Sequence, residues 1–83
     1  MKKSWYAYIA RCSDNTLYTG ITTSLDRRIE EHNIGNKGAK YTRSRRPVKL
    51  VYSESFATKS GAAKREAVIK NMRIEDKRKL ITD

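Results

Sequence analysis

Two segments near the start of the chain, WYAYIARC at residues 5–12 and LYTGIT at residues 17–22, are rich in aromatic and β-branched residues. Such residues favour β-strands, and the polar residues 13–16 between the segments are typical of a turn. The two segments therefore predict a β-hairpin.

The register of this hairpin follows from its apolar residues. We expect the odd-numbered residues to share one buried face, namely Ala7, Ile9, Leu17, Thr19 and Ile21. The residue numbers of each opposing pair must then add up to an even number, which requires a loop with an odd number of residues. The three residues from Asp14 to Thr16 would meet this requirement. The even-numbered residues fall on the other face, and they are Tyr6, Tyr8, Tyr18, Gly20 and Thr22.

The second face carries two tyrosines, Tyr8 and Tyr18, beside Gly20, which has no side chain. This grouping predicts a shallow polar niche. The alternative is that both rings pack beneath a helix with their hydroxyls at its edge.

The remaining elements are read from caps, breakers and apolar spacing. Thr23 and Ser24 predict the start of a helix over residues 25–33, which Gly35 ends. A basic, glycine-containing loop over residues 34–46 follows, then a third strand over 48–55, a helix from Thr58 or Ser60 to Met72, and a short helix over 75–81. The order is β-β-α-β-α-α. It predicts one α/β domain of the α+β type over residues 1–83, with a small, mostly antiparallel three-stranded sheet flanked by helices.

The composition limits the classes of protein to consider. A chain of 83 residues holds one domain. Its single cysteine, Cys12, excludes an internal disulfide and a multi-cysteine zinc site. The N-terminus lacks the apolar stretch of a signal peptide, and no run reaches membrane-spanning length. We therefore expect a monomeric cytoplasmic protein.

The charge indicates an anionic partner. Nineteen Lys and Arg against nine Asp and Glu give a formal net charge of +10. Neutralising phosphates releases counterions, so a small domain this basic is typical of nucleic-acid binding. A merely soluble basic surface or a membrane-facing one is the alternative, although no basic amphipathic membrane helix stands out. The cations expected to grip the nucleic-acid backbone lie in the loop, and they are Lys37, Lys40, Arg43, Arg45 and Arg46.

Arg28 and His32 are four residues apart and so lie on one face of the first predicted helix. Arg28 is next to the buried stripe of Leu25 and Ile29, from which it could reach the tyrosines. A guanidinium there suits the oxygens of a phosphate. The alternatives are an arginine paired with Glu31 or His32 in solvent, and a histidine that caps the helix or lies on the surface.

Glu66 interrupts the apolar stripe of the second long helix. Its neighbours one turn away include Ala62, Ala63 and Ile69. A carboxylate on the packed side of a helix costs roughly several kcal/mol unless it is paired or binds a cation. The alternative is an ordinary ion pair with Lys70.

The chain lacks the residue groupings that other hydrolytic mechanisms need. The remaining acids are scattered without two-metal spacing, and no Ser/His/Asp arrangement, Cys/His arrangement or nucleotide-binding glycine loop is present. A hydrolase built on this chain would use one hard cation on one carboxylate, with Mg²⁺ completed by waters as the best fit.

Four segments taken together resemble the GIY-YIG endonuclease superfamily, and most of all its small stand-alone bacterial branch. They are Trp5–Ile9, Leu17–Thr22, Arg27-Arg28 and Glu31–Asn33. The spacing from Tyr18 to Arg28 and a lone glutamate on the helix after the third strand also fit. The resemblance covers nearly the whole chain.

The resemblance implies a role for each matching residue. Tyr8 corresponds to the tyrosine that ends the first motif, and Tyr18 and Gly20 correspond to the second motif. Arg28 corresponds to the family arginine and His32 to a histidine found in part of the superfamily. By the same resemblance, Glu66 is the sole protein ligand of a divalent metal, Mg²⁺ or another.

Three positions depart from the family pattern. Tyr6 stands where the first motif has glycine, Thr19 where the second has an aliphatic residue, and Ile21 where some members have lysine. The sequence shows no convincing match for a late asparagine of several members.

The expected function is Mg²⁺-dependent hydrolysis of a DNA phosphodiester, with repair or recombination as its setting. Tyr8 or Tyr18 would orient or deprotonate the attacking water, Arg28 would stabilise charge on phosphorus, and a protein partner would supply specificity. The first alternative is a non-catalytic module whose tyrosines stack on bases. A weaker one is an assembly domain whose basic face meets an acidic protein.

Overall fold

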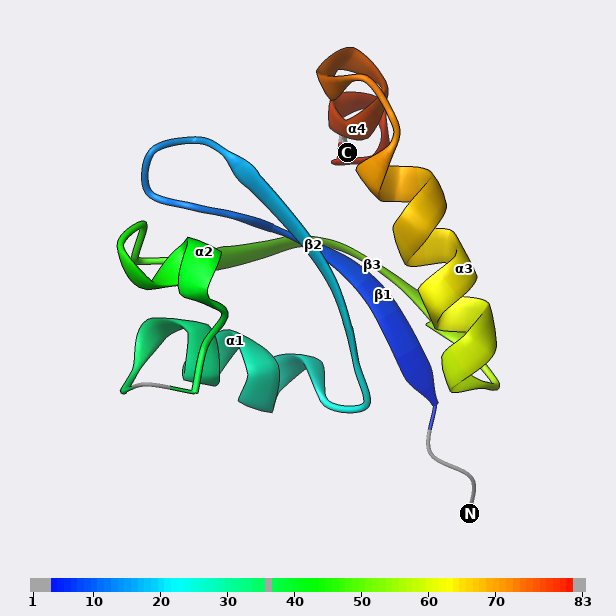
Figure 1. Cartoon of the computed structure of the whole chain (residues 1–83), viewed down its shortest axis with the longest axis horizontal. Helices are drawn as coiled ribbons and strands as arrows, with labels where there is room; N and C mark the ends of the chain where they lie inside the picture. Colours follow the sequence, from blue (N-terminus) through cyan, green and yellow to red (C-terminus); the bar gives the residue numbers. More distant parts are fainter. Residues whose placement is uncertain (1–3, 36, 82–83) are drawn as a thin grey trace.

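A three-stranded sheet in the order β2-β1-β3 forms the centre of the fold. The computed structural model describes residues 4–35 and 37–81, so residues 1–3, 36 and 82–83 of the predicted domain lie outside the described part. The elements are β1 (Trp5–Arg11), β2 (Leu17–Thr22), α1 (Leu25–Asn33), α2 (Lys40–Arg43), β3 (Lys49–Phe56), α3 (Lys59–Lys70) and α4 (Ile74–Ile81). Helices α1 and α2 lie on one side of the sheet, and α3 and α4 lie on the other (Figure 1).

The predicted fold class is confirmed. Both strand pairs are antiparallel, and the long elements follow the predicted order with bounds that differ by at most a few residues. The difference is α2, a four-residue helix inside the predicted basic loop. Thr42, which is fully buried, is hydrogen-bonded to His32 Nδ1 of α1 at 2.9 Å, so a tertiary contact stabilises a helix too short to show a period.

The parity of the hairpin register is confirmed, but the predicted position of the loop is wrong. Tyr8 opposes Gly20 and Arg11 opposes Leu17 at the end of the strands. The Cys12 amide donates to the Thr16 carbonyl at 2.9 Å, so this pair continues the same register and the turn is closed by residues 13–15, one residue earlier than predicted. Asn15 takes a φ of 72° in this turn, a conformation that asparagine tolerates.

The sheet is packed on both faces. On the face of the even-numbered residues, Tyr8, Ala10 and Cys12 form a buried cluster with Val48, and Leu25 and Ile29 of α1 pack against it.

The opposite face carries Ala7 and Ile9, which are fully buried. Helix α3 contacts β1 and β2, and its residues Ala62 and Ile69 are also fully buried. Thr58 caps α3 by accepting a hydrogen bond from the Gly61 amide at 3.0 Å. None of the helices among the described residues is both long enough and apolar enough to cross a bilayer.

Candidate functional site

Tyr8, Tyr18 and Gly20 meet on the face of the sheet that α1 covers. A Cβ atom at Gly20 would lie 2.7 Å from the Tyr8 hydroxyl oxygen and 3.1 Å from Cε2 of Tyr18. Contacts this short are not tolerated, so position 20 requires glycine for Tyr8 to take its place. The two ring centroids are 6.3 Å apart.

His32 joins this group from α1. Its Nε2 lies 2.8 Å from the Tyr8 hydroxyl oxygen, and its ring contacts the edge of the Tyr18 ring at a centroid distance of 5.1 Å. Tyr8 is 1% exposed and His32 is fully buried. The prediction of a shallow niche is therefore wrong for Tyr8, because α1 covers its ring, whereas Tyr18 is only half-buried.

The hydrogen bonds of Thr42 determine which atom is the donor in each hydrogen bond of His32. The Thr42 hydroxyl donates its single hydrogen to the Ala39 carbonyl, so it must accept from His32 Nδ1 at 2.9 Å. With the hydrogen on Nδ1, the Nε2 atom of a neutral His32 is an acceptor, and the Tyr8 hydroxyl donates to it. Thr42 therefore sets the tautomer of His32. The sequence analysis did not identify Thr42 as a site residue, because nothing in its surroundings along the chain indicates burial.

Burial shifts the pKa values of both partners away from the physiological range. Desolvation is the main cause that lowers the pKa of His32 from 6.5 to about 4, with the Arg28 charge adding to it. Desolvation, followed by Tyr18, raises the pKa of Tyr8 to about 12, although Arg28 opposes the rise. At neutral pH the proton therefore stays on Tyr8 and His32 is uncharged.

We expect the protein to lose stability as the pH falls from about 6.5 to about 4. The folded His32 has a lower pKa than the unfolded one, so the unfolded state takes up the proton first and stability is full only above pH 6.5. The shift corresponds to roughly 3 kcal/mol of unfolding free energy. Urea titrations at several pH values measure it, and His32→Gln should flatten the curve in this window. An equally steep curve in the variant would assign the loss to other groups.

Thr42→Val should reduce the unfolding free energy by about 1–3 kcal/mol, because it leaves the buried His32 Nδ1–H without an acceptor. Thr42→Ser keeps the hydroxyl and is the matched control. Nitrogen chemical shifts of the imidazole report the tautomer directly. They should show hydrogen on Nδ1 in the wild type and in the serine variant, and a weakened preference in the valine variant. An unchanged tautomer and stability in Thr42→Val would contradict the assigned role.

Arg28 lies beside both phenols. Its Nη1 donates to Glu31 Oε1 at 3.0 Å and to the Lys37 carbonyl at 2.9 Å. The pairing with Glu31 that the sequence left open is therefore present. Burial lowers the pKa of Arg28, but the bond to Glu31 and then the neighbouring Tyr8 and Tyr18 raise it above its usual value. A half-buried cation thus faces two hydroxyls and remains tied to the basic segment by its bond to Lys37.

Glu66 reaches the same neighbourhood from α3. Its carboxylate pairs with Lys70 Nζ at 3.3 Å, as the alternative reading of the sequence had it, and its side chain is 23% exposed. The carboxylate lies close enough to Tyr8 to add a small upward effect on that residue's pKa.

The donor set at Glu66 fits one kind of metal. Among the described residues, no group of three or more His, Cys, Asp or Glu side chains could hold an ion. A structural zinc or calcium cage is therefore not built from them. Mg²⁺ is held by one or two carboxylates with waters and substrate phosphates, and a partly exposed Glu66 fits that pattern.

A hollow of about 250 Å³ opens at the β2 edge of the sheet, next to these groups. Tyr18 lines it together with Tyr41 of α2 and with Lys70 and Lys77. Tyr41 stacks on Tyr18 at a centroid distance of 6.1 Å, and the Arg45 guanidinium lies 4.1 Å from the centre of the Tyr41 ring. Sequence reasoning missed Tyr41, Lys70 and Lys77, because only the tertiary fold brings α2, α3 and α4 to this edge.

The five cations predicted to grip nucleic acid have different surroundings. Arg45 pairs with Asp14 at 3.0 Å, and Arg46 donates to the carbonyls of His32 and Gly35, so these two hold the segment in place. The other three are exposed: Lys37, Lys40 and Arg43. In this segment Arg45 and Arg46 therefore anchor the backbone, while the charged side chains of the other three residues reach solvent.

Comparisons with known proteins agree with this arrangement. A family model described as the GIY-YIG catalytic domain matches residues 4–79. A UPF0213 protein of Desulfotalea psychrophila is 55% identical over 80 residues, which are 96% of this chain and 73% of the relative. A UPF0213 protein of Staphylococcus haemolyticus is 54% identical over 78 residues, 94% of each chain.

Solved structures of similar proteins share the fold. A protein of E. faecalis, solved by NMR, is 47% identical with a TM-score of 0.62, over 92% of this chain and 80% of that one. The NMR structure of a UPF0213 protein of Bacillus halodurans is 42% identical with a TM-score of 0.59, over 94% and 82% of the two chains. The name UPF0213 states no activity, whereas the family model supports a nuclease-like role. The resemblance inferred from the sequence is confirmed, and the chain belongs to the GIY-YIG catalytic domain family.

Proposed function

We propose that this protein is a divalent-metal-dependent endonuclease that hydrolyses DNA phosphodiesters, acting as a monomer on structures formed in repair or recombination. The observation that supports it most is the placing of Arg28 beside two phenols over Gly20, with Glu66 at the same group. Arginine, tyrosine and one carboxylate are the groups that bind a phosphate, orient a water and hold a hard cation.

Tyr8 and Tyr18 have different roles in this proposal. Tyr18 is half-buried and lines the open hollow, so its hydroxyl orients the attacking water. Tyr8 is closed off from solvent and donates to His32, so it positions the site from behind and keeps Arg28 and Tyr18 in place. The Arg28 guanidinium binds the scissile phosphate and stabilises the charge that develops on it.

Glu66 would hold the metal, and Lys70 would give up its ion pair to allow this. A bound Mg²⁺ supplies neutralisation of charge on the phosphate and leaving oxygens. The exposed pair with Lys70 is worth only a few tenths of a kcal/mol, roughly, so releasing it costs little.

Substrate binding should also change the state of His32. The Arg28 charge contributes to the low pKa of His32, and a phosphate on Arg28 offsets that charge. The pKa of His32 therefore rises when the substrate is bound. The Tyr8–His32 pair then becomes better able to accept a proton from the site, although burial still opposes it.

Lys37 and Lys40 are exposed beside the site and should contact phosphates. Replacing both with alanine should lower the slope of log affinity against log salt by about two, one for each lost contact. Fluorescence anisotropy with a short duplex over a salt series measures this. The matched control is Lys49→Ala with Lys64→Ala, which removes the same charge from β3 and α3. Equal slopes in the two double variants would mean that DNA does not follow the 37–46 segment.

The proposed function is tested by incubating the purified protein with branched, flapped and linear DNA in the presence of Mg²⁺. Cleavage that prefers one shape supports an endonuclease and identifies its substrate class. Salt-sensitive DNA binding without any cleavage would instead establish a non-catalytic binding module. Absence of both would leave protein assembly as the role of the basic surface.

A further inference from the structure

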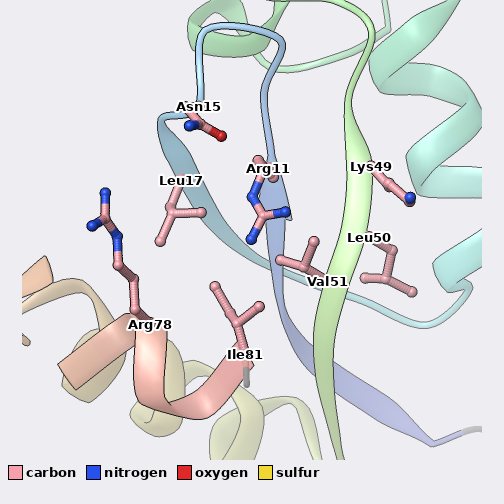
Figure 2. Close-up of a pocket in the computed structure, with 8 residues that line it drawn as sticks. All are labelled: Arg11, Asn15, Leu17, Lys49, Leu50, Val51, Arg78 and Ile81. Atoms are coloured by element: carbon pink, nitrogen blue, oxygen red, sulfur yellow. The ribbon is translucent and has the colours of Figure 1, made fainter. Parts of the chain in front are cut away.

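A second hollow, larger than the one that Tyr18 lines, shares Leu17 with it but is otherwise lined by different residues. It has a volume of about 780 Å³ and is bounded by the β1–β2 hairpin, β3 and α4 (Figure 2). Arg11 projects into it from β1, while Arg78 and Ile81 face it from α4 (Figure 2). Arg11 belongs to the same face of β1 as Ala7 and Ile9, and Tyr8 belongs to the other face. The proposed catalysis makes no use of this cleft.

The chemistry of the cleft selects an anion. Arg11, Lys49 and Arg78 line it together with Asn15, and none of the described lining residues is acidic. Arg11 and Lys49 are also direct partners across β1 and β3, and like charges in such positions destabilise a sheet. A bound anion at Arg11 would offset part of this repulsion.

The floor of the cleft is aliphatic. Leu17, Val51 and Ile81 line it, and no described aromatic residue does. Nucleobases are bound mainly by stacking on aromatic rings, whereas aliphatic floors accept aliphatic side chains. An occupant with carboxylates and an apolar side chain matches both the rim and the floor better than a nucleic-acid strand does.

We propose that this cleft is a docking site for an acidic peptide segment of a partner protein, in which Asp or Glu flanks a Leu or Ile. The carboxylates pair with Arg11 and Arg78, and the aliphatic side chain rests on Leu17, Val51 and Ile81. Arg11 lies on the face of the sheet opposite to Tyr8 and Tyr18, so a docked partner leaves the α1 side of the sheet open, although Leu17 lines both hollows. The inference does not depend on the protein being a nuclease.

The test uses a synthetic peptide in which Glu and Asp alternate with Leu and Ile, added to the isotope-labelled protein and followed by NMR. Saturable amide shifts should be centred on the cleft residues. Arg11→Glu with Arg78→Glu should weaken binding by tenfold or more, since both carboxylate partners are reversed. Arg27→Glu with Lys64→Glu removes the same net charge from exposed positions outside the cleft and should change the affinity by less than about twofold.

Two further probes separate the competing occupants. A peptide with Ser in place of Leu and Ile should bind at least about tenfold more weakly, because it has no apolar surface to bury. A single-stranded oligonucleotide of equal charge should not compete at the cleft. Any one of four results would overturn the proposal. They are an equal loss of peptide affinity in the two charge-reversal variants, equal binding of the serine peptide, displacement of the peptide by the oligonucleotide, and absence of saturable binding.

Discussion

Glu66→Gln is expected to abolish metal-dependent cleavage, with a fall in rate of ~10³-fold or more, because a metal's stabilisation of phosphoryl charge is worth several kcal/mol. Glutamine keeps the size of the side chain but removes the charge that would hold Mg²⁺. The fold should be nearly unaffected, since the substitution removes only a partly exposed ion pair with Lys70 among the described residues. Single-turnover rates at saturating DNA measure the effect.

A matched control separates the metal role from a general loss of negative charge. Glu75→Gln makes the same change at an exposed position at the start of α4 and should leave the rate unaltered. DNA affinity without metal should be the same in both variants. Full cleavage by Glu66→Gln would mean that the cation is held elsewhere or that none is needed.

Tyr18→Phe and Tyr8→Phe should each reduce the rate by ~10²-fold or more. The first removes the hydroxyl that orients the water, and the second removes the residue that keeps Arg28 and Tyr18 in place. Their effects on stability should differ. Tyr8→Phe leaves the buried His32 Nε2 without a donor and should reduce the unfolding free energy by about 1–3 kcal/mol. Tyr18 lies half-buried at the open edge, so its variant should remain nearly as stable as the wild type.

Tyr6→Phe is the control for both variants. Tyr6 lies on the same face of the sheet as Tyr8 and is two residues before it in β1. It opposes Thr22, whereas Tyr8 opposes Gly20. Its loss should change neither the rate nor the stability by more than a small amount. A Tyr18→Phe protein with the wild-type rate would remove this phenol from the mechanism, even with the fold intact.

The hairpin shows what a single sequence can predict. The parity of Ile9, Leu17 and Ile21 is sufficient to place Tyr8 and Tyr18 on one face with Gly20, because side chains alternate strictly along a strand. The predicted loop residues were wrong because the Cys12–Thr16 hydrogen bond and the left-handed Asn15 place the turn at residues 13–15 instead of 14–16. Parity constrains the faces but not the position of the turn.

The interior of the site was less accessible to sequence reasoning. Arg28, His32 and Glu66 were identified as candidates from helix positions, and the structure brings all three to the tyrosines. Their depth was not predictable, since burial of Tyr8 depends on how α1 crosses the sheet. Thr42 and Tyr41 come from α2, a helix that tertiary contacts create, so no periodicity could have indicated them.

The central claim is that Tyr18, Arg28 and Glu66 form one metal-dependent phosphodiesterase site. It is tested most directly by the cleavage rate of the purified wild-type protein on end-labelled DNA, measured with Mg²⁺, with EDTA, and with Mg²⁺ restored after EDTA. We predict cleavage in the first and third conditions and none in the second. Cleavage at the same rate in EDTA, or no cleavage of any DNA that the protein binds in Mg²⁺, would contradict the claim.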